Sequence, residues 1–169
     1  VDNQNLINED KIIFDERKRF KNFELEINNF PVKFDQNPAY NYEEIHRNLE
    51  NLCNIFDKSK NKLISKFNQL DCSVEIYLIT NQELEKSLSN GQKPENVNKK
   101  LMNHTNESNN KIMIYLSEFC LYKLVILGGS WNSINFGAAY YRTPNIYEPN
   151  LDFLLNIYFN IIFKRFKSN

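Results

Sequence analysis

The sequence predicts an α+β fold, in which a mostly antiparallel sheet packs against a long amphipathic helix and a buried C-terminal helix. Three observations lead to this expectation. Apolar and polar residues alternate at several points, as they do in half-buried strands. Residues 41–70 carry one apolar stripe with helical spacing. Residues 150–167 are apolar around most of a helix, with a polar residue at every fourth position.

The chain has 169 residues, which is enough for one domain with its own hydrophobic core. Its first ten residues are polar, so we expect 1–10 to be a flexible N-terminus and 11–169 to form a single α+β domain. The 28 Asn, 17 Ile and 16 Lys residues share AT-rich codons, and an AT-rich genome is the simplest explanation for their abundance. Motifs built from Asn or Lys therefore carry little weight.

A β-hairpin is predicted near the N-terminus. Apolar and acidic residues alternate over residues 23–27, and a second alternation covers residues 30–34. The pair Asn28-Asn29 between them tolerates a tight turn. Pro31 has no backbone N–H to donate, which places the second strand at a sheet edge.

A long helix is predicted over residues 41–70. Asn41 followed by Glu44 resembles a capping box at its start. A straight helix of this length would measure about 45 Å, at about 1.5 Å per residue. That is long for a domain of this size, so we expect a break near residues 57–60.

Two strands and a short helix are predicted in the middle of the chain. Apolar residues alternate over 74–78 and again over 112–116, which predicts a strand in each segment. Thr80 with Glu83 forms a second capping-box pattern, and the helix it opens should end near Asn90-Gly91. The polar residues 91–110 are expected to be the most mobile region, with a turn of helix around 97–102.

The C-terminal third predicts two more strands and a helix. The continuous apolar run 121–127 is typical of a buried strand, and Gly128-Gly129 is expected to form a tight turn between strands. Residues 135–141 predict another strand, closed by Thr143-Pro144. The final helix should expose a single polar stripe. That stripe consists of Asp152, Asn156, Asn160 and Lys164.

No arrangement of catalytic residues or metal ligands is recognisable, so we predict no catalytic residue, no cofactor and no metal. The three cysteines lie among apolar neighbours at wide spacing, which is typical of reduced, buried thiols in a cytoplasmic protein. His46 and His104 are each predicted to be surface histidines. The longest apolar stretch has nine residues, far short of the ~20 that a membrane span needs.

The aromatic segment 131–147 is the best candidate for a binding surface. It contains the only Trp, and Trp, Tyr and Arg are the residue types that dominate the energetics of protein–protein contacts. We therefore expect a non-enzymatic module that covers or inhibits a partner protein, for example a bacterial immunity protein that neutralises a cognate toxin. The alternative for this segment is that Trp131 and Phe136 fill the core while the tyrosines line a face of the sheet. The predicted partner-binding residues are Trp131, Tyr140, Tyr141, Arg142 and Tyr147.

Two other functions stay open at this point. The first is a small enzyme with a dispersed site that draws on Cys72, Cys120, His46 and the Gly128-Gly129 turn. The second is a single-stranded nucleic-acid binder that uses the basic–aromatic clusters 17–21 and 164–167. The formal net charge of zero argues against nucleic acid as a partner.

Overall fold

The computed structural model describes residues 40–135 and 140–169. These residues belong to one compact unit, 37–169. The predicted hairpin, its Pro31 edge, the basic cluster 17–21 and the predicted boundary at residue 10 lie outside the described residues. Phe136 also lies outside them.

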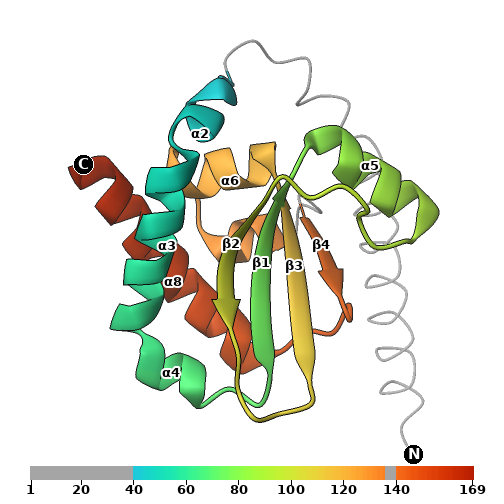
Figure 1. Ribbon diagram of the computed structural model, residues 1–169, viewed down its shortest axis with the longest axis vertical. Helices are drawn as coiled ribbons and strands as arrows, with labels where there is room; N and C mark the ends of the chain where they lie inside the picture. Colours follow the sequence, from blue (N-terminus) through green and yellow to red (C-terminus); the bar gives the residue numbers. More distant parts are fainter. Residues whose placement is uncertain (1–39, 136–139) are drawn as a thin grey trace, which may run out of the picture. The chain divides into compact units, whose positions relative to one another are not determined.

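A four-stranded mixed sheet forms the centre of this unit, with helices around it, so the predicted α+β class is confirmed (Figure 1). The strands lie in the order β2-β1-β3-β4. Their bounds are β1 Ser73–Ile79, β2 Lys99–His104, β3 Lys111–Ser117 and β4 Tyr140–Thr143. The helices are α2 Glu43–Arg47, α3 Leu49–Lys62, α4 Ile64–Asn68, α5 Asn81–Asn90, α6 Glu118–Val125, α7 Trp131–Asn135 and α8 Pro149–Ser168.

The sheet is only partly antiparallel. β1 pairs with β2 and β3 with β4 in antiparallel fashion, but the central pair, β1 and β3, is parallel. The chain between β1 and β3 passes through α5 and the edge strand β2. This connection is long enough for β3 to run parallel to β1. In this parallel register Ile76 lies opposite Ile114, and Tyr77 lies opposite Tyr115.

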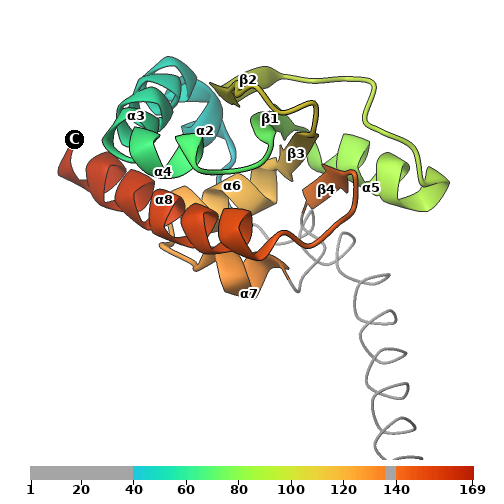
Figure 2. The ribbon, with the colours of Figure 1, turned by 90° about the horizontal axis from the view of Figure 1, so that it is seen from below.

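The two faces of the sheet have different coverings (Figures 1 and 2). α6 packs against β1 and β3 on one face, and α8 packs in turn against α6, α7 and α3. The main core lies here, with Ile76 and Ile114 fully buried. On the other face, α5 covers one end, where Leu84 packs on Ile79 and Tyr115.

The predicted strands 74–78 and 112–116 and the predicted helix after Thr80 are all confirmed. The Thr80 hydroxyl accepts a hydrogen bond from the Glu83 N–H, as the capping pattern predicts. Gly91 then ends α5 with φ of +64°, a backbone conformation that favours glycine. Local signals at both ends of this helix were therefore sufficient to place it.

The predicted long helix 41–70 is divided into α2, α3 and α4, so the expected break at residues 57–60 is wrong. The chain leaves helical geometry at Asn48 and at Leu63 instead. At Asn48 the side-chain amide donates to the Glu44 carbonyl, a local bond that competes with helix continuation. The predicted N-cap at Asn41 is also wrong by one residue, because the N-cap of α2 is Tyr42. Oδ1 of Asn41 accepts a hydrogen bond from the N–H of Glu43.

Two segments adopt a different structure from the one predicted. The apolar run 121–127 lies mostly in helix α6, which is buried on nearly every side, and periodicity alone does not separate a buried helix from a buried strand. Residues 99–104, expected to be mobile with a turn of helix, form β2, because pairing with β1 supplies backbone partners that their own sequence does not reveal. Of the predicted strand 135–141, Tyr140 and Tyr141 lie in β4 and Asn135 lies in α7, and residues 136–139 are outside the described part of the chain.

Gly128 lies in a turn between two helices, α6 and α7, and not between strands as predicted. Its φ is +70°, and a Cβ at this position would lie 2.8 Å from the ring of Phe163 on α8. Any other residue here would have to adopt this left-handed backbone and displace the end of the Phe163 ring, so the position favours glycine.

The predicted C-terminal helix is confirmed as α8, but part of its predicted polar stripe is wrong. Asp152 is 1% exposed, whereas the apolar side chains of Phe153 and Ile157 are 70% and 37% exposed. Asn160 and Lys164 are exposed as expected. The start of α8 thus buries a carboxylate and presents apolar side chains to solvent.

Candidate functional site

Three of the predicted partner-binding residues meet inside the protein around the carboxylate of Asp152. The Trp131 indole N–H donates to Oδ1 of Asp152 over 3.0 Å. Nη1 of Arg142 donates to both carboxylate oxygens, at 2.9 and 3.0 Å. The ring of Tyr140 lies 4.9 Å from that of Trp131. We call these four residues the Asp152 cluster.

The Asp152 cluster has a structural role in the folded chain. Trp131 is 0% exposed and Arg142 is 6% exposed, so neither presents a side chain to a partner at the surface. This placement agrees with the alternative in which Trp131 fills the core. Burial raises the pKa of Tyr140 to about 12, so its phenol stays protonated near neutral pH.

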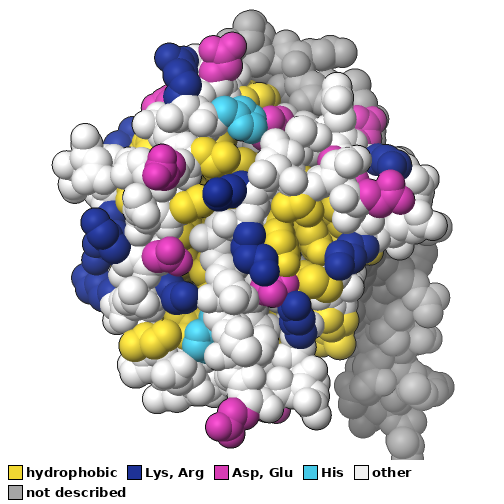
Figure 3. Space-filling view, in the orientation of Figure 1, with side chains coloured by type: hydrophobic (Ala, Val, Ile, Leu, Met, Phe, Trp, Pro, Cys, Tyr) yellow, Lys and Arg dark blue, Asp and Glu magenta, His cyan; other side chains and the backbone are white. Residues whose placement is uncertain are grey.

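Tyr141 points to the opposite face of β4 and belongs to a row of three tyrosines across the sheet. The strand registers place Tyr77, Tyr115 and Tyr141 side by side. The rings of Tyr77 and Tyr115 are stacked with centroids 5.0 Å apart, and Tyr141 meets Tyr115 edge-on at 6.2 Å. In Figure 3 this face shows hydrophobic side chains over the strands, bordered by basic side chains (Lys or Arg).

Glu75 lies beside this tyrosine row and forms ion pairs with two lysines. Its carboxylate contacts Nζ of Lys100 at 3.1 Å and Nζ of Lys111 at 3.0 Å, and it accepts the Tyr77 hydroxyl. Burial alone would raise the pKa of Glu75, but the hydrogen bonds from Tyr77, Lys111 and Lys100 outweigh it and lower the pKa to about 2. The charged side chains on this part of the sheet face therefore pair with one another.

The three most exposed large apolar side chains of the described residues lie close together in sequence, around the start of α8. Ile146 is 61%, Tyr147 66% and Phe153 70% exposed, and Ile157 follows one helical turn after Phe153. We call these four residues the apolar patch. A solvent-facing group of this kind is a feature of interaction surfaces.

Comparisons with protein-family models, with curated proteins and with solved structures give no match to this chain. Candidate functions must therefore be judged from side-chain geometry. Of the five predicted contact residues, Tyr147 is the one that is largely exposed, and Tyr140 and Tyr141 are half-buried.

The cysteines and histidines show little of the chemistry that a dispersed Cys/His site requires. Burial raises the pKa of Cys53, Cys72 and Cys120, so each thiol is protonated and weakly nucleophilic near neutral pH. Nε2 of His46 lies 2.7 Å from Oε1 of Glu118. His104 is 4% exposed on β2, where its ring packs against Phe67, so the prediction of a surface histidine is wrong for this residue.

Two further observations bear on the site. Within residues 40–135 and 140–169, no three His, Cys, Asp or Glu side chains gather in the way that metal ligands do. None of the described helices combines the length and the apolar character that crossing a membrane requires.

His104 should make stability depend on pH. Burial and the nearby Lys60 ammonium hold the pKa of His104 below its usual value of 6.5. Below pH 6.5 the unfolded chain therefore binds this proton more readily than the folded one, and the free energy of unfolding should fall as pH falls. One such group contributes a slope of at most about 1.4 kcal/mol per pH unit. Urea denaturation at intervals between pH 7.5 and 5.5 measures this slope.

The matched variants for this experiment are His104→Gln and Asn103→Gln. The first should flatten the dependence on pH, because the buried imidazole is gone. The second replaces the exposed neighbour on β2, a side chain that does not titrate, so it should keep the wild-type slope. An unchanged slope in His104→Gln would contradict this assignment.

Sequence reasoning missed three members of the apolar patch. Phe153 and Ile157 lie within a helix that is apolar nearly all round, so nothing in the pattern separates them from core residues such as Leu154 and Leu155. Ile146 follows the Thr143-Pro144 pair in a loop, where an isolated apolar residue carries no periodic signal. The exposed fraction of each side chain in the fold was the information needed.

Proposed function

We propose that this chain is a non-enzymatic protein-binding module, and that it contacts its partner through the apolar patch. The observation that carries this proposal is the exposure of Ile146, Tyr147 and Phe153 at the start of α8. Burial of such side chains by a partner would be favourable, with a free energy of about 25 cal/mol for each Å² of apolar surface removed from water. Aromatic anchors of this type contribute most of the binding energy in many interfaces.

Two features around the patch support a binding role. Asp152 anchors the first turn of α8 from inside through Arg142, and the Glu148 N–H, at the N-cap, donates to Oδ2 of Asp152. The start of the helix is therefore held in place, which lowers the entropy cost of presenting Tyr147 and Phe153 to a partner. The raised pKa values of the three thiols also favour a binding role over nucleophilic catalysis.

The proposal is tested by affinity capture from host lysate with three forms of the chain. The wild type should enrich a specific protein, and the variant Tyr147→Ser/Phe153→Ser should lose it, with an affinity lower by about tenfold or more. The matched control Ile64→Ser/Leu88→Ser replaces side chains that are 40% and 37% exposed on α4 and α5 and should capture as the wild type does. Quantitative mass spectrometry compares the three baits.

Two outcomes would overturn the proposal. One is that no protein depends on the patch for its capture. The other is that the purified chain is a dimer in sedimentation analysis and that the patch variant is a monomer, since the patch would then be covered by a second copy of the chain.

An inhibitory role, as in toxin-neutralising immunity proteins, is the specific form of this function that we propose. It predicts that the captured partner is harmful when it is expressed alone. Co-expression of the wild-type chain should restore growth, and co-expression of Tyr147→Ser/Phe153→Ser should not. If expression of the partner alone does not affect growth, the chain is a binding module without an inhibitory role.

A further inference from the structure

A second surface is a groove between α3 and the C-terminal half of α8. Its volume is about 500 Å³, within the range of roughly 300–1,000 Å³ that is common for small-molecule sites. Asn51 and Asn54 line it from α3, and Ile55 and Ile161 contribute its apolar surface.

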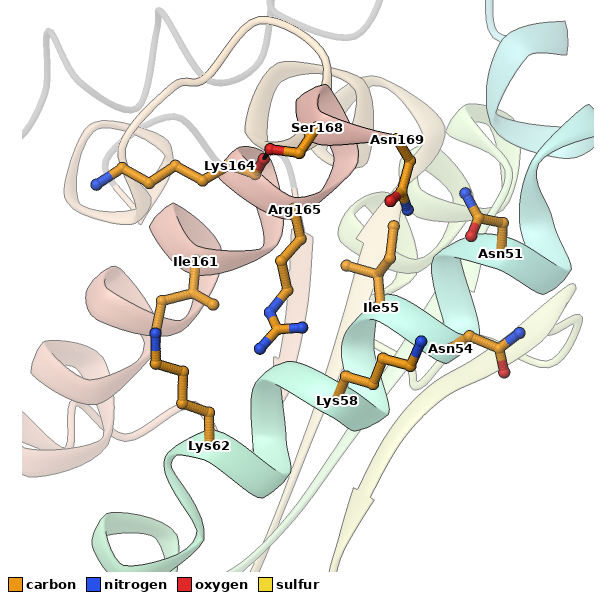
Figure 4. A pocket seen from close by; sticks show the side chains of 10 residues that line it. All are labelled: Asn51, Asn54, Ile55, Lys58, Lys62, Ile161, Lys164, Arg165, Ser168 and Asn169. Carbon is orange, nitrogen blue, oxygen red and sulfur yellow. Dashed lines mark hydrogen bonds between the residues drawn. The ribbon is translucent and has the colours of Figure 1, made fainter.

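Cationic side chains from both helices reach this groove. Lys58 and Lys62 are one helical turn apart on α3, and Arg165 faces them from α8 (Figure 4). Lys164 also lines the groove, but its ammonium group points away from the other three in Figure 4. The lining residues, all of which are described, include no Asp and no Glu.

The rest of the described chain supplies no ion-pair partner to these cations. None of Lys58, Lys62 and Arg165 has a carboxylate within ion-pair distance among the described residues. By contrast, Lys86, Lys100 and Lys111 each have a carboxylate partner. Like charges one turn apart on a helix repel one another, so the arrangement is unfavourable for the free chain. An anion in the groove would relieve that repulsion.

We propose that the groove between α3 and α8 binds a small phosphate compound that carries two or more negative charges. The guanidinium fork of Arg165 matches phosphate oxygens, and Lys58 and Lys62 supply point charges on the opposite wall. Asn51 and Asn54 add amide donors at one end. Ile55 and Ile161 accommodate an organic portion of the ligand.

The lining favours a small ligand over single-stranded nucleic acid. Nucleic-acid channels combine cations with aromatic rings on which bases stack, and no aromatic side chain lines this groove. In the predicted basic–aromatic cluster 164–167, Phe166 is half-buried and does not line the groove.

The test uses inorganic tripolyphosphate as a probe in isothermal titration calorimetry with the full chain. The variant Lys62→Gln/Arg165→Gln should weaken binding by about tenfold or more. The control Lys66→Gln/Lys93→Gln changes the net charge equally at exposed lysines away from the groove, so its affinity should stay close to that of the wild type. A wild-type chain that does not bind tripolyphosphate overturns the proposal, and so does equal weakening in both variants.

Thermal denaturation separates ligand binding from a structural role. Basic residues near helix C-termini also stabilise the helix dipole, so a purely structural groove predicts that Lys62→Gln/Arg165→Gln melts at a lower temperature without any ligand. Our proposal predicts that this variant melts at or above the wild-type temperature without ligand, and that tripolyphosphate raises only the wild-type and control temperatures. A lower melting temperature with an unchanged response to tripolyphosphate would contradict it.

A single-stranded oligothymidylate completes the experiment at equal phosphate concentration. We expect it to bind more weakly than tripolyphosphate, and its binding to depend little on Lys62 and Arg165. Tighter binding that the groove variant removes would overturn the proposal and indicate a nucleic-acid site in its place.

Discussion

Replacing Asp152 with Asn should lower the free energy of unfolding by about 3–5 kcal/mol, because it leaves the buried Arg142 guanidinium without a counter-charge. The substitution preserves size and shape, so the loss measures charge and not packing. Arg142 and Asp152 have side chains that are only 4% and 2% exposed, so water cannot replace the missing carboxylate. Urea denaturation followed by circular dichroism measures the change.

The control for this experiment is Asp57→Asn, which removes an exposed carboxylate from α3 and should change stability by less than about 0.5 kcal/mol. A second variant, Arg142→Met/Asp152→Leu, removes both charges together. It should recover most of the loss, because a buried ion pair is often no more stable than an apolar pair of similar volume. Among the residues that the structure describes, no carboxylate other than Asp152 pairs with Arg142, which strengthens that expectation. A loss below about 1 kcal/mol in Asp152→Asn would contradict the role given to this pair.

Leu155→Ala should destabilise the chain by about 2–5 kcal/mol, the usual cost of emptying a well-packed leucine site. Leu155 is 0% exposed in α8, the helix that contacts α3, α6 and α7. Its neighbour Asn156 is half-buried, and Asn156→Ala should change stability little. Thermal denaturation of the two variants tests this, and a shift near zero for Leu155→Ala would show that α8 is a surface helix with little part in the core.

The elements that could be predicted from sequence are those with a complete local signal. β1 and β3 show alternation, α5 has a capping residue and a terminal glycine, and α8 has a long apolar pattern. Each of these signals depends on the segment itself. β2 depends on pairing with β1, and α6 depends on surroundings that bury it on most sides, so neither was visible in its own residues.

The positions of Arg142 and Asp152 in the fold could not be predicted from the sequence. The sequence predicts Arg142 as a contact residue because Arg is common in protein–protein contacts, and it predicts Asp152 on the polar stripe of α8 because polar residues recur there at every fourth position. In the fold they neutralise one another, and Trp131 joins them through its indole N–H. A pattern of polar and apolar residues does not reveal which two charges, ten positions apart, will meet. Tyr147 was predicted as a contact residue, and its exposure leaves it available for that role.

The arrangement of the strands also bears on how the protein avoids aggregation. Sheets present unpaired N–H and C=O groups along their outer strands, and such strands can recruit other chains into fibrils. In the described sheet the outer strands are β2 and β4. β4 has only four residues, and β2 begins with the exposed Lys99 and Lys100 and packs beside α3. Short length, positive charge and a neighbouring helix are the means by which natural sheets discourage edge-to-edge growth, so the chain can carry an apolar patch without also offering a long, flat edge for polymerisation.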